Sequence, residues 1–204
     1  MQENTQNMLA GLPYRPDTDE LGKLSSQAHR LCRDYNLTCD DDKLERKMIV
    51  DKLFPDHGKS VYLQGPIQID YGCFTHLGDN FYANFNFTVL DTCPVKIGKN
   101  VMCGPNVTLA TPLHPLTYAQ RNIRKQADGK MADVEYGAPI TIGDNCWLAT
   151  NVTICAGVTI GAGCVIGAGA VVTKDMPENS LVLGVPAKAV RKITDADRLE
   201  SFPY

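Results

Sequence analysis

Residues 140–173 read ITIGDNCWLATNVTICAGVTIGAGCVIGAGAVVT, and an aliphatic residue returns in them at every sixth position. The repeating residues are Ile142, Leu148, Ile154, Ile160, Ile166 and Val172. The position four residues after each of the first five carries a small or short side chain: Cys146, Val152, Val158, Cys164 and Ala170. A period of six fits neither the helical period of 3.6 nor the strand period of two. It predicts a parallel β-helix, in which each hexad forms one short side of a coil.

An earlier array has the same period and is interrupted once. Its aliphatic positions are Leu77, Ala83 and Val89 and then, after a slip of two residues, Ile97, Cys103 and Leu109. The slip predicts a bulged or looped corner. Between Leu113 and Pro139 the repeat disappears into a polar stretch rich in Arg, Lys and Asp. We interpret this stretch as an excursion from the coil, long enough to have a function.

Two helices are predicted before the coil, over residues 19–38 and 40–54. Leu21, Leu24, Ala28 and Leu31 recur at helical spacing in the first. Such helices can cover the open end of a solenoid, whose terminal backbone edge is otherwise exposed. The predicted organisation is a helical cap over residues 1–58, a coil over 59–192 with an excursion over 114–138, and a tail over 193–204.

The composition favours one soluble domain with a thin aliphatic core. The chain has 204 residues, of which 44% are hydrophobic and only 7% aromatic, and a net charge of −3. This net charge is too small to produce an electrostatic field that would favour nucleic acid or a membrane as partner. The sequence shows no apolar run of transmembrane length and no signal-peptide core, so a cytoplasmic protein is expected. Eight cysteines occur without a Cys-x-x-Cys pair, which favours reduced core thiols over disulfides or a zinc site.

The hexads and several other segments resemble the maltose and galactoside O-acetyltransferases, within the hexapeptide-repeat acyltransferases. The other segments are Met8-Leu9-Ala10-Gly11 with Tyr14 after it, Asp70-Tyr71-Gly72, Asn80-Phe81-Tyr82-Ala83-Asn84-Phe85-Asn86, His114-Pro115-Leu116, Val172-Thr173-Lys174-Asp175 and Gly184-Val185-Pro186-Ala187-Lys188. The resemblance implies a left-handed coil, acetyl transfer from acetyl-CoA to a sugar hydroxyl, and a homotrimer with active sites between subunits.

Transfer of an acetyl group to a hydroxyl requires a base, and imidazole has a suitable pKa at neutral pH. The sequence contains four histidines. His29 falls on a predicted helix and His57 in a turn, where a surface role is favoured, and His76 precedes a repeat and could face solvent or another subunit. His114 stands where the coil gives way to the excursion, and the resemblance implies that it is the general base.

Other polar residues are candidates for the oxyanion and the acceptor. Asn84 could donate to the oxyanion of the tetrahedral intermediate or orient the acceptor, although an Asn at a coil corner is the plainer interpretation. Asp70 and Asp91 could accept hydrogen bonds from sugar hydroxyls, and solvated surface acids are an equal alternative. The resemblance also places an acceptor-binding acid at Asp17.

Acetyl-CoA would need a groove for its pantetheine arm and cations for its phosphates. The resemblance implies contacts at Ala149, Ala168, Thr173, Lys174, Lys188 and Arg191. Lys188, Arg191 and Lys192 place three bases within five residues, as a 3′-phosphate site would, and a solvated charged surface is the alternative.

Three other functions stay open from the sequence. A zinc enzyme resembling the γ-type carbonic anhydrases would need three histidine ligands, and only His76 and His114 lie in or beside the coil. A non-catalytic scaffold would retain the coil without the chemistry. The stretch 121–136 is longer and more charged than the connection expected in the family, so the acceptor could also be a xenobiotic hydroxyl.

Overall fold

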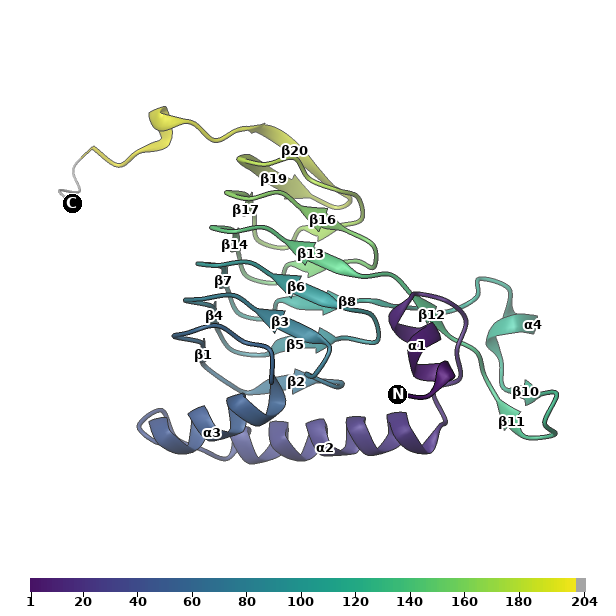
Figure 1. Ribbon diagram of the computed structural model, residues 1–204. Coiled ribbons are helices and arrows are strands. Elements are labelled where there is room, and N and C mark those ends of the chain that lie inside the picture. Colours follow the sequence, from purple (N-terminus) through teal and green to yellow (C-terminus); the bar gives the residue numbers. More distant parts are fainter. Residues whose placement is uncertain (201–204) are drawn as a thin grey trace.

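A three-sided coil forms the body of the protein in the computed structural model, which describes residues 1–200 (Figure 1). The first side contains β1 (Tyr62–Leu63), β4 (Tyr82–Ala83), β7 (Met102–Cys103), β14 (Trp147–Leu148), β17 (Val165–Ile166), β19 (Ser180–Gly184) and β20 (Ala187–Lys192). The second contains β2 (Ile67–Ile69), β5 (Phe87–Leu90), β8 (Thr108–Ala110), β15 (Thr153–Ile154) and β18 (Val171–Val172). The third contains β3 (Thr75–Leu77), β6 (Val95–Ile97), β13 (Ile140–Ile142) and β16 (Thr159–Ile160).

Strands of successive turns pair in parallel, and their register keeps each hexad above the last. Ile142, for example, stands opposite Ile97 below it and Ile160 above it. All the repeating aliphatic residues and the small residues four positions later are at most 2% exposed. A buried Ile, Leu or Val contributes about 1.5–3 kcal/mol, so this continuous column is the main stabilising term. The predicted left-handed parallel β-helix is confirmed.

Asparagine ladders support two of the corners. Asn80, Asn100 and Asn145 have positive φ and are joined by side-chain hydrogen bonds of 2.9 Å from one turn to the next. Asn86, Asn106 and Asn151 repeat the arrangement at another corner, with distances of 2.8 Å. Asn tolerates the left-handed conformation and leaves a carboxamide free to bond along the coil axis.

The third turn contains the excursion, between β8 and β13. The chain leaves through β9 (Pro112–Leu113), passes α4 (Tyr118–Arg121) and a hairpin of β10 (Arg124–Lys125) and β11 (Met131–Ala132), and returns through β12 (Tyr136–Gly137). β9 and β12 pair in antiparallel fashion, which makes the base of the excursion a two-stranded ribbon. The slip after Val89 lies at this same corner one turn earlier, where Asp91, Thr92 and Cys93 are buried.

Helices cover the lower end of the coil. α2 (Asp19–Asn36) and α3 (Lys43–Leu53) lie across it in Figure 1, where the predicted ranges were 19–38 and 40–54. Buried Cys32, Tyr35 and Val50 belong to the same core cluster as the coil interior. A shorter helix, α1 (Glu3–Leu9), was not predicted, and it lies beside the excursion.

The upper end of the coil is closed by a β-hairpin rather than by a helix. β20 pairs antiparallel with β19, and a 3₁₀ turn, η1 (Asp195–Asp197), follows. Part of the predicted tail, residues 201–204, lies outside the described residues. No helix in the described part of the chain is long and apolar enough to cross a membrane.

Candidate active site

His114 and Glu135 face one another at the outer end of the β9/β12 ribbon. Leu113 is paired with Tyr136, so the next pair along an antiparallel ladder is His114 with Glu135. His114 Nε2 lies 4.0 Å from Glu135 Oε1. The histidine side chain is 48% exposed and the glutamate 17% exposed. The ribbon therefore supplies an accessible imidazole with a carboxylate behind it.

The second oxygen of Glu135 is held by Tyr14. Tyr14 Oη donates a hydrogen bond of 2.6 Å to Glu135 Oε2. Two backbone hydrogen bonds, of 2.9 and 3.0 Å, join the same two residues. Burial, followed by the bond to Glu135, raises the pKa of Tyr14 far above its usual value, so its hydroxyl keeps its proton.

Asp70 belongs to the same region of the surface. Burial, followed by the charge of Asp91, raises the pKa of Asp70 to about 6. The charge of Glu135 acts in the same direction, whereas His29, whose Nε2 is 3.9 Å from Asp70 Oδ1, opposes it. With its side chain 33% exposed, Asp70 can still meet an acceptor.

Asp91 does not fit the predicted role in acceptor binding. It is fully buried, and its two oxygens accept hydrogen bonds from the Tyr71 N–H (2.9 Å) and the Thr75 hydroxyl (2.8 Å). Burial raises the pKa of Asp91 as well. These contacts support the corner below the excursion, because they satisfy polar groups that the slip in the repeat leaves inside the coil. This prediction is wrong for Asp91.

Asp17 has its carboxylate engaged by Arg15. Two hydrogen bonds, from Arg15 Nε (2.9 Å) and Nη2 (2.7 Å), reach its two oxygens. They hold the pKa of Asp17 below its usual value. Arg15 Nη1 also lies 2.6 Å from Asp128 Oδ2 in the hairpin of the excursion. An acceptor would have to compete with Arg15 for Asp17, whose role in acceptor binding stays a prediction.

Asn84 stands at a different corner from His114. It follows β4, between the first and second sides of the coil, whereas the excursion leaves between the second and third. The Phe85 N–H donates to Asn84 Oδ1 at 2.7 Å, which leaves the side-chain amide as the group available to donate. We call these two corners the Asn84 edge and the His114 edge. One chain does not bring the two predicted catalytic residues together.

Two of the remaining histidines, His57 and His76, are placed apart from this site. His57 contacts Asp51 at 3.0 Å near the cap, and His76 lies on β3 with Nδ1 3.0 Å from Asp56. A pocket of about 550 Å³ lies near His57, between α3 and the start of the coil, and includes Tyr35 and Arg46 in its lining. It shares no residue with the His114 site.

The comparisons with known proteins point to one family. The maltose acetyltransferase hexapeptide capping motif matches residues 7–58, and the bacterial transferase hexapeptide (six repeats) matches residues 139–174. The galactoside O-acetyltransferase of Escherichia coli (strain K12) is 37% identical over 194 residues, which cover 95% of this chain and 91% of that protein.

Solved structures agree over nearly the whole chain. A maltose O-acetyltransferase from Clostridium difficile 630 is 38% identical with a TM-score of 0.87, covering 95% of this chain and 99% of the other. A galactoside acetyltransferase in complex with coenzyme A is 34% identical with a TM-score of 0.88, covering 100% and 97%. This chain belongs to the maltose and galactoside acetyltransferase family. The predicted family, and an acetyl-CoA-dependent acyltransferase as the type of enzyme, are confirmed.

Against this family background, the six residues predicted to contact the donor fall into three places. Ala149 and Ala168 lie on the Asn84 edge, one turn apart. Thr173 and Lys174 are exposed on the His114 edge, above the excursion. Lys188 and Arg191 are on β20, where Arg191 donates to Asp197 at 2.7 and 2.9 Å. Four of the six candidate donor residues are thus divided between the same two edges as the candidate catalytic residues.

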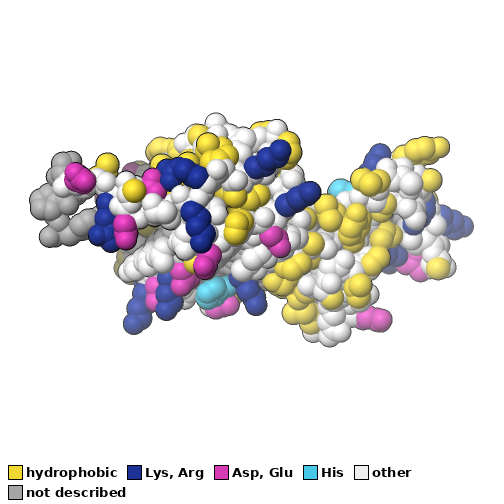
Figure 2. Space-filling view, turned by 90° about the horizontal axis from the view of Figure 1, so that it is seen from above, with side chains coloured by type: hydrophobic (Ala, Val, Ile, Leu, Met, Phe, Trp, Pro, Cys, Tyr) yellow, Lys and Arg dark blue, Asp and Glu magenta, His cyan; other side chains and the backbone are white. Residues whose placement is uncertain are grey.

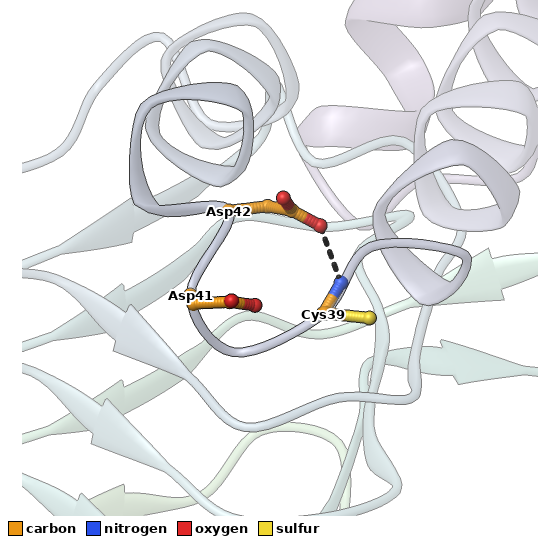
Figure 3. Close-up of side chains that lie close together, drawn as sticks. All are labelled: Cys39, Asp41 and Asp42. Carbon is orange, nitrogen blue, oxygen red and sulfur yellow. Dashed lines mark hydrogen bonds between the residues drawn. The ribbon is translucent and has the colours of Figure 1, made fainter.

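Two groups of side chains among the described residues could hold a metal ion. His114, Asp133 and Glu135 form one, with ligand atoms within 4.8 Å of one another. Cys39, Asp41 and Asp42 form the other, in the exposed loop before α3 (Figure 3). There the Cys39 N–H donates to Asp42 Oδ2 at 2.7 Å, a bond that shapes the loop without a metal. Each group contains one histidine or none, unlike a three-histidine zinc site.

Sequence reasoning did not find Glu135, and it assigned no role to Tyr14, which it noted only as part of the family resemblance. Glu135 lies in the polar stretch that interrupts the repeat, and no periodicity there indicates which of its acids returns to the coil. The pairing of Leu113 with Tyr136 supplies that information. Tyr14 is 121 residues from Glu135, so only the fold shows the contact.

Proposed function

We propose that the protein transfers the acetyl group of acetyl-CoA to a hydroxyl of a sugar, with His114 as general base. The His114–Glu135 pair is the observation that carries this proposal. An exposed imidazole held beside a carboxylate is suited to accept a proton, because the carboxylate stabilises the imidazolium that forms. The sugar O-acetyltransferases among the family's members support the acceptor class.

His114 accepts the proton of the acceptor hydroxyl as the hydroxyl oxygen attacks the thioester carbonyl. The new C–O bond forms, the C–S bond breaks, and the imidazolium returns its proton to the departing sulfur. No covalent acyl-enzyme is required. The buried thiols agree with direct transfer, since burial raises the pKa of Cys103 and Cys146 and makes them poor nucleophiles.

The oxyanion donor in this proposal comes from a second copy of the chain. Asn84 and His114 occupy different edges, and so do Ala149 and Thr173 of the predicted donor site. Placing the Asn84 edge of one copy against the His114 edge of the next joins both sets at once. Repetition of this heterologous contact closes a ring, and the three-sided cross-section fits a homotrimer.

The Asn84 edge suits an extended donor. Gly104, Ala149 and Ala168 follow one another up this edge, and such small residues allow a pantetheine arm to approach the backbone. Above it, Lys188 is exposed and could meet a phosphate. Arg191, by contrast, is already paired with Asp197.

Asp70 and the excursion form the acceptor side in this proposal. The charge of Glu135 helps to raise the pKa of Asp70, and Asp70 is partly exposed, so it is the proposed hydrogen-bond partner for a second hydroxyl of the acceptor. The excursion adds exposed apolar side chains at Leu116, Tyr118 and Ile123. A hydroxylic acceptor with an apolar portion, including a xenobiotic, is therefore the second candidate.

The test is release of the CoA thiol in the presence of maltose, glucosides, galactosides, alkyl glucosides and chloramphenicol. His114→Ala should reduce acceptor-dependent release by roughly a hundredfold or more. His76→Ala is the matched control, because His76 also pairs with an acid on the coil surface. Equal activity in the wild type and His114→Ala would refute the base assignment, and acetyl-CoA binding without transfer to any acceptor would favour the scaffold.

A further inference from the structure

Tyr14 makes the best-defined contact near the proposed base, and nothing in the proposed chemistry yet uses it. It is 3% exposed, so its hydroxyl is removed from bulk water. It donates to one oxygen of Glu135, while His114 lies beside the other. The three side chains thus form a chain from the N-terminal segment to the imidazole.

The contact restrains Glu135 in both backbone and side chain. The paired backbone hydrogen bonds fix the Cα position of Glu135, and the phenol bond fixes the rotation of the carboxylate. A carboxylate with one oxygen engaged presents the other in a defined direction. Because the Tyr14 hydroxyl keeps its proton, it acts as a permanent donor to Glu135.

The same segment also holds the far end of the excursion. Arg15 Nη1 lies 2.6 Å from Asp128 in the hairpin between β10 and β11. That ion pair is solvent-exposed on the Asp128 side, where the side chain is 47% exposed. Solvent screening and side-chain entropy make such exposed pairs weak, so the buried Tyr14–Glu135 contact is the stronger restraint.

We propose that Tyr14 is a positioning residue for the base, acting through Glu135 to orient the carboxylate that faces His114. This inference rests on the proposed role of His114. It assigns the capping segment a part in catalysis as well as in covering the coil. Tyr14 itself need not touch either substrate.

Tyr14→Phe removes only the hydroxyl and tests the proposal. We expect kcat to fall roughly tenfold, since a small displacement of a catalytic group can cost one to two orders of magnitude, while both KM values change less than about twofold. In a Glu135→Ala background, Tyr14→Phe should have no further effect on kcat, because Tyr14 acts through Glu135.

Two controls separate positioning from a loss of structure. Tyr35→Phe removes another buried tyrosine hydroxyl, which donates from the cap to the Leu63 carbonyl of β1 at 2.5 Å, and should lower Tm without lowering kcat. Asp128→Asn breaks the Arg15 pair at the other end of the excursion and should leave kcat within about twofold.

An unchanged kcat in Tyr14→Phe would overturn the proposal, as would an equal fall in Asp128→Asn or an additive effect with Glu135→Ala. A wild-type enzyme that transfers no acetyl group would instead contradict the proposed function. The wild-type rate therefore distinguishes the two failures.

Discussion

Asn84 and His114 lie on two different edges of the same triangular coil. Asn84 is fixed at the corner after β4, and its carboxamide oxygen is bonded to the Phe85 N–H. His114 stands at the end of a ribbon that leaves the coil between β8 and β13. One whole side of the coil separates the two corners, so a single chain cannot present both residues to one substrate without unwinding.

Chains that lack only one of these residues should therefore complement each other. In the proposed trimer, His114→Ala and Asn84→Ala should each retain little activity alone, because every intersubunit site then lacks one group. In trimers that contain both kinds of chain, about one site in three combines both native residues. Activity of the mixture should approach that fraction of the wild-type value, measured after co-expression and separation by two affinity tags.

The control is a mixture of two His114→Ala chains that carry different tags. It shows whether mixing alone restores activity. Absence of complementation in mixed trimers of confirmed composition would show that both residues act within one chain or that one of them is dispensable.

The raised pKa of Asp70 predicts a pH-dependent change in stability. The folded protein binds a proton on Asp70 more tightly than the unfolded chain does, so stability falls as pH rises from about 4 to about 6. Asp70→Asn has no carboxyl to ionise, so its stability should not fall in this way. Above about pH 6 it should be more stable than wild type, by on the order of 1 kcal/mol after allowance for solvent screening. The two proteins should unfold alike near pH 4.

Thermal unfolding across this range measures the effect, with Asp34→Asn as the control for removal of one exposed negative charge. A difference between Asp70→Asn and wild type that stays constant with pH would contradict the assignment. If Asp70 also binds the acceptor, the stabilised variant should show a raised acceptor KM.

The coil could be predicted in detail because its determinants are local. Each hexad carries its own inward aliphatic residue, so positions such as Leu148 and Ile160 are found without knowledge of the rest of the chain. Asp91 was misassigned for the complementary reason. Its sequence neighbours do not show that the slip turns it inward, toward Thr75 of the preceding turn. Contacts between distant segments, such as Tyr14 with Glu135, require the assembled fold.

Lys188 should contribute more to donor binding than Arg191. Both are on β20, but the guanidinium of Arg191 is held by Asp197, whose bond also raises the pKa of Arg191. Lys188→Ala should raise the KM for acetyl-CoA roughly tenfold, as expected for loss of one charge-assisted phosphate contact, with little change in acceptor KM. Arg191→Ala should change the KM for acetyl-CoA less than about threefold. Initial rates at varied acetyl-CoA concentration decide between them, and a larger effect at Arg191 would show that donor binding displaces Asp197.

The hairpin of the excursion should govern acceptor preference. Arg124 stands directly opposite Ala132, so residues 125–131 can be replaced by Gly-Gly without moving the strands that flank the hairpin. The deletion removes Met131, one of the exposed apolar residues on this end of the molecule, where Figure 2 shows hydrophobic side chains gathered beside the coil. The acceptor KM for an alkyl glucoside should rise about fivefold or more, and that for glucose less, because apolar contacts contribute about 25 cal/mol per Å² of buried surface.

Acetyl-CoA KM should stay within about twofold in the same variant, since β20 and the two edges of the coil are unchanged. Asp128→Asn is the matched control, because the deletion also removes the partner of Arg15. Equal losses for acetyl-CoA and for both acceptors would mean that the hairpin supports the active site as a whole. A selective loss for the alkyl glucoside would identify the hairpin as the apolar wall of the acceptor pocket.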